Sequence, residues 1–232
     1  MTKPLILVAG GMGYIGSHTV VELINAGYEA LIVDNLSNSN LGVLDGIDAI
    51  TGKRPEFIKA DCADLDAMRS IFASHPAIAG VIDFAASKAV NESVHKPLLY
   101  YRNNIVSLLN LLECINGAPE CRGIVFSSSC TVYGEPDTNP VTEMSPVKPA
   151  TSPYGNTKQI SDLCIAMAEE LGLDWRQDVS NNVVIWKKAS PGCENSKPII
   201  LQGHLDMVCA KEDGCTKDMT REGLDLRTDG QW

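Results

Sequence analysis

Tyr154 and Lys158 lie four residues apart in the run TSPYGNTK, and this spacing places both side chains on one face of a helix. An ammonium group beside a phenol stabilises the phenolate and lowers the pKa of the phenol, so the pair predicts a general base that works near neutral pH. Ser129 and Thr131 stand upstream in the run FSSSCTVYG, where the Ser129 hydroxyl could hold a substrate oxygen. Each side chain has an ordinary alternative, namely a solvated helix Lys, a surface Tyr and a turn Ser. Their joint order along the chain favours catalysis.

A glycine-rich turn near the N-terminus predicts a nucleotide-binding site. Gly10, Gly13 and Gly16 stand between a predicted strand over residues 4–9 and apolar positions that recur at helical spacing over residues 15–26. Glycines at this point let backbone N–H groups approach a pyrophosphate at the helix N-terminus. Asp34 follows at the end of a second predicted strand, where its carboxylate would bind an adenosine ribose and repel a 2′-phosphate, which favours NAD over NADP. The alternative is a glycine turn that only packs helix on strand.

The elements that position these residues alternate along the chain. Apolar runs predict strands over residues 4–9, 30–33, 57–60, 80–85 and 123–128, and helical periodicity covers residues 64–73, 98–115 and 157–171. This alternation predicts an α/β fold with a doubly wound parallel sheet. Asp61, at the end of the third predicted strand, has two open interpretations: a contact with the adenine edge, or the N-cap of the next helix.

Composition narrows the class of protein. The 232 residues carry a formal net charge of −10, which argues against a nucleic-acid partner. The eight cysteines form no Cys-x-x-Cys pair, so a zinc ribbon or a redox dithiol is not indicated. The sequence shows neither an 18-residue apolar run nor a leader peptide, and we therefore expect a cytoplasmic protein that does not span a membrane.

Five sequence runs carry a resemblance to a known family: GGMGYIGSH, VDNLSNS, DFAASKAVNESVHKPLLYYRNN, FSSSCTVYG and SPYGNTKQ. Through them, residues 1 to about 160 resemble the UDP-glucose 4-epimerases, extended members of the short-chain dehydrogenase/reductase superfamily. The resemblance implies a Rossmann-like NAD-binding domain and an NAD-dependent interconversion of UDP-glucose and UDP-galactose through a 4-keto intermediate. It implies that Tyr154 takes the proton from the sugar 4-hydroxyl, that Lys158 binds the nicotinamide ribose, and that Ser129, with Thr131 close by, holds the reacting oxygen.

The same resemblance implies further contacts and partners. The substrate would be a UDP-sugar, and the helix over residues 98–115 would take part in a homodimer interface. The family's Arg-Tyr-Phe-Asn strand motif and its sugar-nucleotide domain are not found after the catalytic helix, so we expect an incomplete sheet and impaired turnover. The positions that match cofactor contacts of the family are Gly10, Gly13, Tyr14, Ile15, Gly16, Asp34, Asn35, Asn38, Ser39, Asp61, Cys62, Phe84, Ala85, Lys88 and Asn103.

The rest of the chain, residues 161–232, is similar to a different family. The runs SDLCIAMAEELGL, NNVVIWKKASPG, QGHLDMVCAKE and GCTKDMTREGLDLRTDGQW resemble di-zinc aminoacyl-histidine dipeptidases. This resemblance implies that His204 is a zinc ligand oriented by Asp206, in an incomplete site because a zinc ion needs three or four ligands. We expect two neighbouring strands, over residues 181–188 and 198–203, in a foreign α/β tail. The alternatives to an epimerase are therefore a dipeptidase fragment and a nucleotide-binding remnant without activity.

Overall fold

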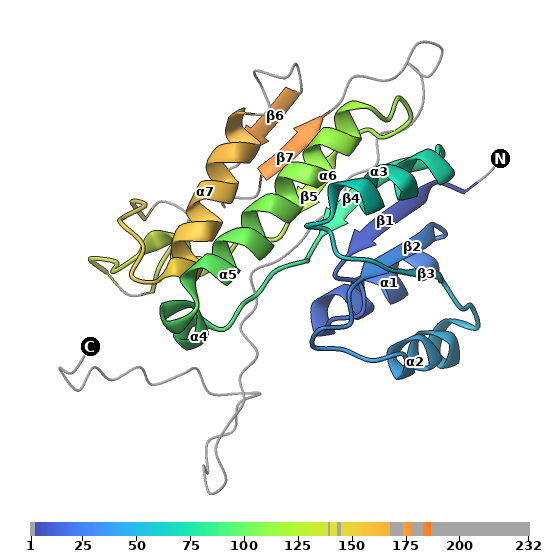
Figure 1. Cartoon of the computed structure of the whole chain (residues 1–232), viewed down its shortest axis with the longest axis horizontal. Coiled ribbons are helices and arrows are strands. Elements are labelled where there is room, and N and C mark those ends of the chain that lie inside the picture. Colours follow the sequence, from blue (N-terminus) through green and yellow to red (C-terminus); the bar gives the residue numbers. More distant parts are fainter. Residues whose placement is uncertain (1–2, 139, 143–144, 168–173, 178–182, 187–232) are drawn as a thin grey trace, which may run out of the picture.

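The computed structural model of the chain describes residues 3–138, 140–142, 145–167, 174–177 and 183–186 (Figure 1). Its centre is a parallel sheet of five strands in the order β3-β2-β1-β4-β5. The register pairs Val8 of β1 with Ile32 on one side and with Ile82 on the other. The strands are β1 (Leu5–Ala9), β2 (Glu29–Asp34), β3 (Glu56–Lys59), β4 (Ile78–Asp83) and β5 (Ile124–Phe126).

Helices cover both faces of this sheet, because β1 is apolar at every position and buries side chains on both sides. Ile6 and Val8 pack in one core cluster with residues of α1 and α2, whereas Leu7 and Ala9 pack in a second cluster with residues of α3, α6 and α7. Figure 1 shows the two helical layers on opposite sides of the strands. The α-helices are α1 (Tyr14–Asn25), α2 (Gly42–Thr51), α3 (Leu65–Ser74), α4 (Val90–His95), α5 (Pro97–Tyr101), α6 (Ser107–Asn116) and α7 (Pro153–Met167).

The predicted α/β fold with a doubly wound parallel sheet is confirmed, and the five predicted strands are present with ends shifted by up to two residues. The predicted helix over residues 98–115 is continuous but contains a π-helical turn, Arg102–Val106, between α5 and α6. Sequence periodicity did not predict α2 and α4. The first carries glycines at two positions, Gly42 and Gly46, which disfavour a helix, and the second has only six residues, too few for a clear helical period.

The described part of the tail adds a short antiparallel pair, β6 (Asp174–Gln177) and β7 (Val183–Trp186). β7 falls within the strand predicted over residues 181–188, contacts β5 and lies beside it in Figure 1. Its hydrogen-bonded partner is β6. The other predicted strand, residues 198–203, lies outside the described residues, and so does His204. The proposed boundary between residues 160 and 161 falls inside α7.

Within the part of the chain that the structure describes, none of the helices has the length and apolar character that crossing a bilayer requires.

The central strand supports a direct prediction on stability. Leu7 has no exposed surface in the core cluster, so Leu7→Ala removes buried methyl groups and leaves a cavity. We expect a loss of about 2–5 kcal/mol in the free energy of unfolding, measured by urea denaturation. Ile50→Ala on α2 is the control, because Ile50 is 69% exposed and its truncation should change stability little. Equal losses for the two variants would contradict this account of the core.

Candidate active site

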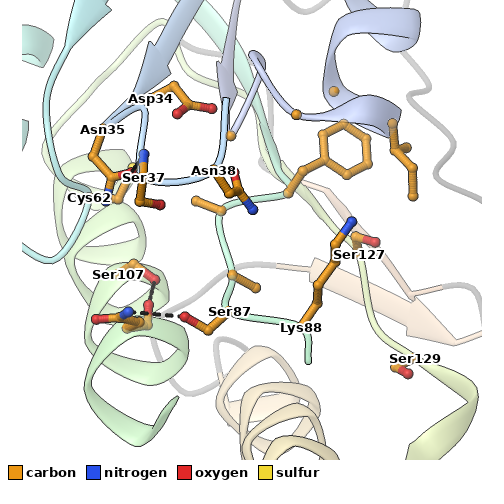
Figure 2. Close-up of a pocket in the computed structure, with 18 of the residues that line it drawn as sticks. Asp34, Asn35, Ser37, Asn38, Cys62, Ser87, Lys88, Ser107, Ser127 and Ser129 are labelled. Carbon is orange, nitrogen blue, oxygen red and sulfur yellow. Dashed lines mark hydrogen bonds between the residues drawn. The ribbon is translucent and has the colours of Figure 1, made fainter. Parts of the chain in front are cut away.

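A cavity of about 560 Å³ lies at the carboxyl ends of the strands. Its walls come from the segments that follow β1, β2, β3, β4 and β5, together with α7 and the π-helical turn. In Figure 2, Asp34 and Asn35 lie at one end of this cavity and Ser127 and Ser129 at the other, with Ser87 between them. An elongated site of this kind, at the carboxyl edge of an open parallel sheet, is where such folds bind ligands.

The turn between β1 and α1 brings backbone against backbone at the cavity wall. Gly10 has a φ of +73°, and a Cβ atom added there would lie 2.8 Å from the backbone of Phe84 and Ala85. A Cβ atom on Gly16 would lie 2.3 Å from the carbonyl oxygen of Gly10. Neither position can therefore carry a side chain without moving the turn. The glycine turn does pack helix on strand, as in the alternative interpretation of the sequence, and this packing lies at the wall of the cavity.

The N-terminus of α1 opens onto the cavity without a capping side chain. Its N-cap residue is Gly13, which has no side chain that could bind the amides of the first turn. Tyr14, Ile15 and Gly16 of that turn all line the cavity. Because the first amides of a helix lack partners within the helix and lie at its positive end, they are available to an anion.

Asp34, at the end of β2, is fixed before any ligand arrives. Its carboxylate accepts hydrogen bonds from the backbone N–H of Met12 at 3.1 Å and of Leu36 at 2.8 Å, and from the Ser39 hydroxyl at 3.3 Å. A carboxylate has about four acceptor positions, so one remains for a ligand donor. The cost of this arrangement is a left-handed backbone at Leu36, with a φ of 59°. Ser39 does not line the cavity and supports Asp34 instead.

The structure decides one of the two interpretations of Asp61. The N-cap of α3 is Asp64, whose side chain accepts a hydrogen bond from the N–H of Ala67. Asp61 instead accepts hydrogen bonds from the N–H of Ala63 at 2.9 Å and from the Asn35 side chain at 3.3 Å, and it lines the cavity. The interpretation of Asp61 as the N-cap is therefore wrong, whereas the adenine contact stays a prediction.

Tyr154, Lys158, Ser129 and Thr131 all line one end of the cavity. The Ser129 hydroxyl accepts hydrogen bonds from the N–H of Thr131 at 3.3 Å and from the Thr131 hydroxyl at 3.0 Å, which fixes its position in the loop after β5. Tyr154 lies in the first turn of α7, where its own N–H donates to the hydroxyl of Ser93 on α4 at 3.1 Å. The short helix α4 thus anchors the start of the helix that carries the predicted base.

The expected lowering of the Tyr154 pKa is not found. Burial raises the pKa of the Tyr154 phenol. A hydrogen bond with Ser129 lowers this pKa but offsets only part of the increase, and the nearby Cys130 thiol raises the pKa further. The Lys158 ammonium group points elsewhere: it donates a hydrogen bond to the Ser127 carbonyl at 2.7 Å and lies 4.4 Å from the centre of the Phe126 ring. The sequence pattern placed both side chains correctly on one helix face, but it carries no information on burial.

Lys158 is itself a strongly perturbed group. It is 4% exposed, and burial lowers the pKa of its ammonium to about 8, against the opposing effect of the Asp83 and Asp162 carboxylates. A lysine with a pKa this close to neutrality, at the wall of a cavity, is typical of functional sites. At pH 7 it still carries its proton.

All the predicted cofactor contacts except Ser39 line the cavity. Residues that the sequence did not predict also line it. Two of them begin helices, Val90 of α4 and Ser107 of α6, and the others lie at or shortly after the carboxyl end of a strand: Val33, Ser37, Ala60, Ala86, Ser87, Ser127, Ser128 and Cys130. Their position at the end of a buried strand was the sequence feature from which they could have been predicted. Asn104 was missed as well. It is 3% exposed in the π-helical turn, and it joins Ser87 to Thr157 of α7 through hydrogen bonds of 2.8–3.0 Å.

Comparisons with known proteins agree with this geometry. The sequence model of the family described as GDP-mannose 4,6 dehydratase matches residues 7–183. The chain is 52% identical over 153 residues to a UDP-glucose 4-epimerase of Bacillus subtilis, covering 66% of this chain and 44% of that protein. It is 44% identical over 174 residues to a UDP-glucose 4-epimerase of Yersinia pestis, covering 75% and 51%.

Comparison with solved structures also supports the fold. A UDP-glucose 4-epimerase of Bifidobacterium longum in complex with NAD+ and UDP superposes with a TM-score of 0.69 at 41% identity, over 72% of this chain and 49% of that one. The enzyme of Stenotrophomonas maltophila, with bound NAD and formylated UDP-arabinopyranose, gives 0.67 at 42% identity over the same shares. The chain thus spans about half the length of the relatives it matches. It belongs to the short-chain dehydrogenase/reductase family of the GDP-mannose 4,6 dehydratases and UDP-glucose 4-epimerases.

Proposed function

We propose that this chain binds NAD and carries the oxidation-reduction chemistry of a UDP-sugar 4-epimerase, an isomerase. The observation that supports it most is the convergence of Tyr154, Ser129 and Lys158 at one end of a cavity whose other end holds Asp34. The resemblance of five sequence runs to UDP-glucose 4-epimerases supports the same activity, and the solved relatives with bound NAD support the cofactor.

The residues present fit NAD. The glycine turn leaves a backbone cradle that a Cβ atom at Gly10 or Gly16 would fill, and the uncapped start of α1 suits a pyrophosphate. Asp34 would hold the adenosine ribose, with Asn35, Asn38 and Asp61 near the same end of the cavity. Lys88 would offer its positive charge to the phosphates. When bound, NAD supplies the hydride acceptor and donor for the sugar carbon C4.

The chain's own residues would handle the proton and the orientation of the sugar. Tyr154 would accept the proton of the sugar 4-hydroxyl on its phenolic oxygen and later return it. Ser129 would hydrogen-bond the same sugar oxygen, because it is fixed by Thr131 beside Tyr154. Lys158 would hold the nicotinamide ribose and contribute its positive charge. Burial raises the pKa of Tyr154. Proton acceptance by its phenolic oxygen therefore needs the positive charge of Lys158 to move closer to Tyr154 when ligands bind.

The first test is NAD binding by isothermal titration, with thermal melting measured in parallel. We expect saturable binding and a rise in melting temperature, because NAD binds only the folded state. Asp34→Ala should weaken binding roughly tenfold or more, since it removes charge-assisted hydrogen bonds to the ribose. Asp45→Ala is the control, because Asp45 is exposed on α2 and pairs only with Arg54. A folded chain that does not bind NAD would contradict the proposed function.

The second test concerns the reaction itself. The chain should convert UDP-galactose to UDP-glucose, slowly because the sugar-nucleotide domain that the resemblance implies is not found after the catalytic helix. Tyr154→Phe should lower the rate by about 100-fold or more, the usual contribution of a general base. Tyr28→Phe, outside the residues that line the cavity, serves as the matched control. Equal rates for Tyr154→Phe and the unmodified chain would remove Tyr154 from the mechanism.

We also propose a homodimer, as the resemblance implies. Leu98 and Leu109 are eleven residues apart on the continuous helix of α5 and α6 and are 82% and 46% exposed. Leu163 on α7 is 64% exposed, and α7 contacts α5. We propose that a second copy of the chain covers these three leucines. The exposed Arg102 lies on the same helix between Leu98 and Leu109, so the interface would include one charged side chain.

Analytical ultracentrifugation tests the dimer. Replacing apolar side chains at the interface with arginine should favour the monomer, since a buried unpaired charge is costly. We expect Leu98→Arg and Leu163→Arg each to lower the dimer fraction, and Ile50→Arg on the distant helix α2 to leave it unchanged. An unmodified chain that sediments as a monomer at all concentrations would contradict the proposal.

For residues 161–232 we propose an origin in the aminoacyl-histidine dipeptidases. Four sequence runs support it. His204, the predicted zinc ligand, lies outside the described residues. We infer shared ancestry with that family for this segment.

A further inference from the structure

Two carboxylates near Lys158, one buried and one half-buried, have no role in the proposed chemistry. Asp83 ends β4 and is 1% exposed; its Oδ1 accepts a hydrogen bond from the N–H of Ala85 at 2.9 Å, and its Oδ2 has no hydrogen-bond partner among the described residues. Asp162 lies on α7, one helical turn beyond Lys158, and its Oδ2 accepts a hydrogen bond from the Ser128 hydroxyl at 2.9 Å. Neither is among the residues that line the cavity. Buried carboxylates without a compensating cation are costly, so both require an explanation.

Both carboxyl residues are connected to the loop that Lys158 binds. The Lys158 ammonium donates to the carbonyl of Ser127 at 2.7 Å. The N–H of the same Ser127 donates to the backbone carbonyl of Asp83 at 3.1 Å. The next residue, Ser128, donates to Asp162. The loop that leads to Ser129 is therefore bound from the β4 side by Asp83 and from the α7 side by Lys158 and Asp162.

The charges of the three residues depend on one another. Burial lowers the pKa of Lys158 to about 8, and the two carboxylates oppose this effect. Burial raises the pKa of Asp83 and of Asp162 to about 6 each, and the Lys158 charge opposes that. Between these values all three groups are ionised, so one cation and two anions share a region of low dielectric.

Other titratable groups line the cavity from the elements around it. They are Tyr14 of α1, Asp34 after β2, Asp61 and Cys62 after β3, Lys88 after β4, Cys130 after β5 and Tyr154 on α7. Among the described residues, Asp83 and Asp162 are the charged groups that oppose the lowering of the Lys158 pKa by burial.

We propose that Asp83 and Asp162 are positioning residues for Lys158: they act as its counter-ions and fix the Ser127–Ser129 loop to which its ammonium binds. The catalytic consequence rests on the proposed function, because it assumes that Lys158 and Ser129 serve the reaction. The electrostatic claim concerns this chain alone and is independent of any ligand.

The test measures the charge of Lys158 directly in the full chain. Lysine labelled with ¹³C at Cε is followed by NMR from pH 6 to 11, with Lys158→Arg to assign the signal. Removing a carboxylate charge destabilises the ammonium, so Asp162→Asn and Asp83→Asn should each shift the Lys158 titration midpoint to lower pH, and the double variant further. Both amides retain an oxygen that can accept the native hydrogen bond.

Two controls separate charge from structure. Asp66→Asn, on the surface of α3 with a side chain 95% exposed, should leave the midpoint unchanged. Ser128→Ala keeps the Asp162 charge but removes its hydrogen bond, so the midpoint should stay close to that of the unmodified chain while turnover falls through Ser129. If Asp83→Asn fails to fold, Asp162→Asn alone decides the question.

Folded Asn variants with an unchanged Lys158 midpoint would overturn the inference, even if the chain binds NAD and epimerises UDP-sugars. Conversely, a shifted midpoint in a chain that does not bind NAD would support the inference and contradict the proposed function. If both stand, the alkaline limb of the epimerase pH profile should also move to lower pH in Asp162→Asn. Asp162→Glu, which restores the charge, should recover most of that shift.

Discussion

The close approach of the turn after β1 to the segment after β4 governs the rest of the site. A side chain at Gly10 would meet the backbone of Phe84 and Ala85 at 2.8 Å, and one at Gly16 would meet Gly10 at 2.3 Å. Because no side chain separates these segments, α1 begins directly at the sheet edge, and its uncapped N-terminus opens onto the cavity. Strand order, glycine placement and the anion-binding potential of the helix are therefore consequences of one packing contact.

The opposite end of the cavity is governed by electrostatics instead of packing. Tyr154 and Lys158 are both buried. Burial raises the pKa of Tyr154 and lowers the pKa of Lys158, so it favours the neutral form of each. Such a site keeps a charged lysine only when carboxylates lie near it, as Asp83 and Asp162 do. Preorganised charges in a dry environment are more effective than the same charges in water, since they need little reorganisation when a ligand reacts.

Much of this site could be predicted from local sequence. The glycine turn, Asp34 and the Tyr154–Lys158 pair each depend on spacing within one or two elements, and short apolar runs located all five strands of the main sheet. What could not be predicted depends on distant residues. Asp83 is only a polar end to a buried strand until folding places it near Lys158. The spacing of Asp162, four residues after Lys158 on α7, could have been read from the sequence, but its hydrogen bond with Ser128 could not. The raised pKa of Tyr154 likewise follows from burial, which spacing does not reveal.

The central claim is that the β1 turn and the start of α1 receive the phosphates of NAD. Amide hydrogen exchange of the full chain, followed by mass spectrometry with and without saturating NAD, tests it most directly. We predict that NAD slows exchange in peptides covering residues 10–17, 34–39 and 84–88, with little change in α2. Unchanged exchange over residues 10–17, in a chain that binds NAD, would contradict this account and place the cofactor elsewhere.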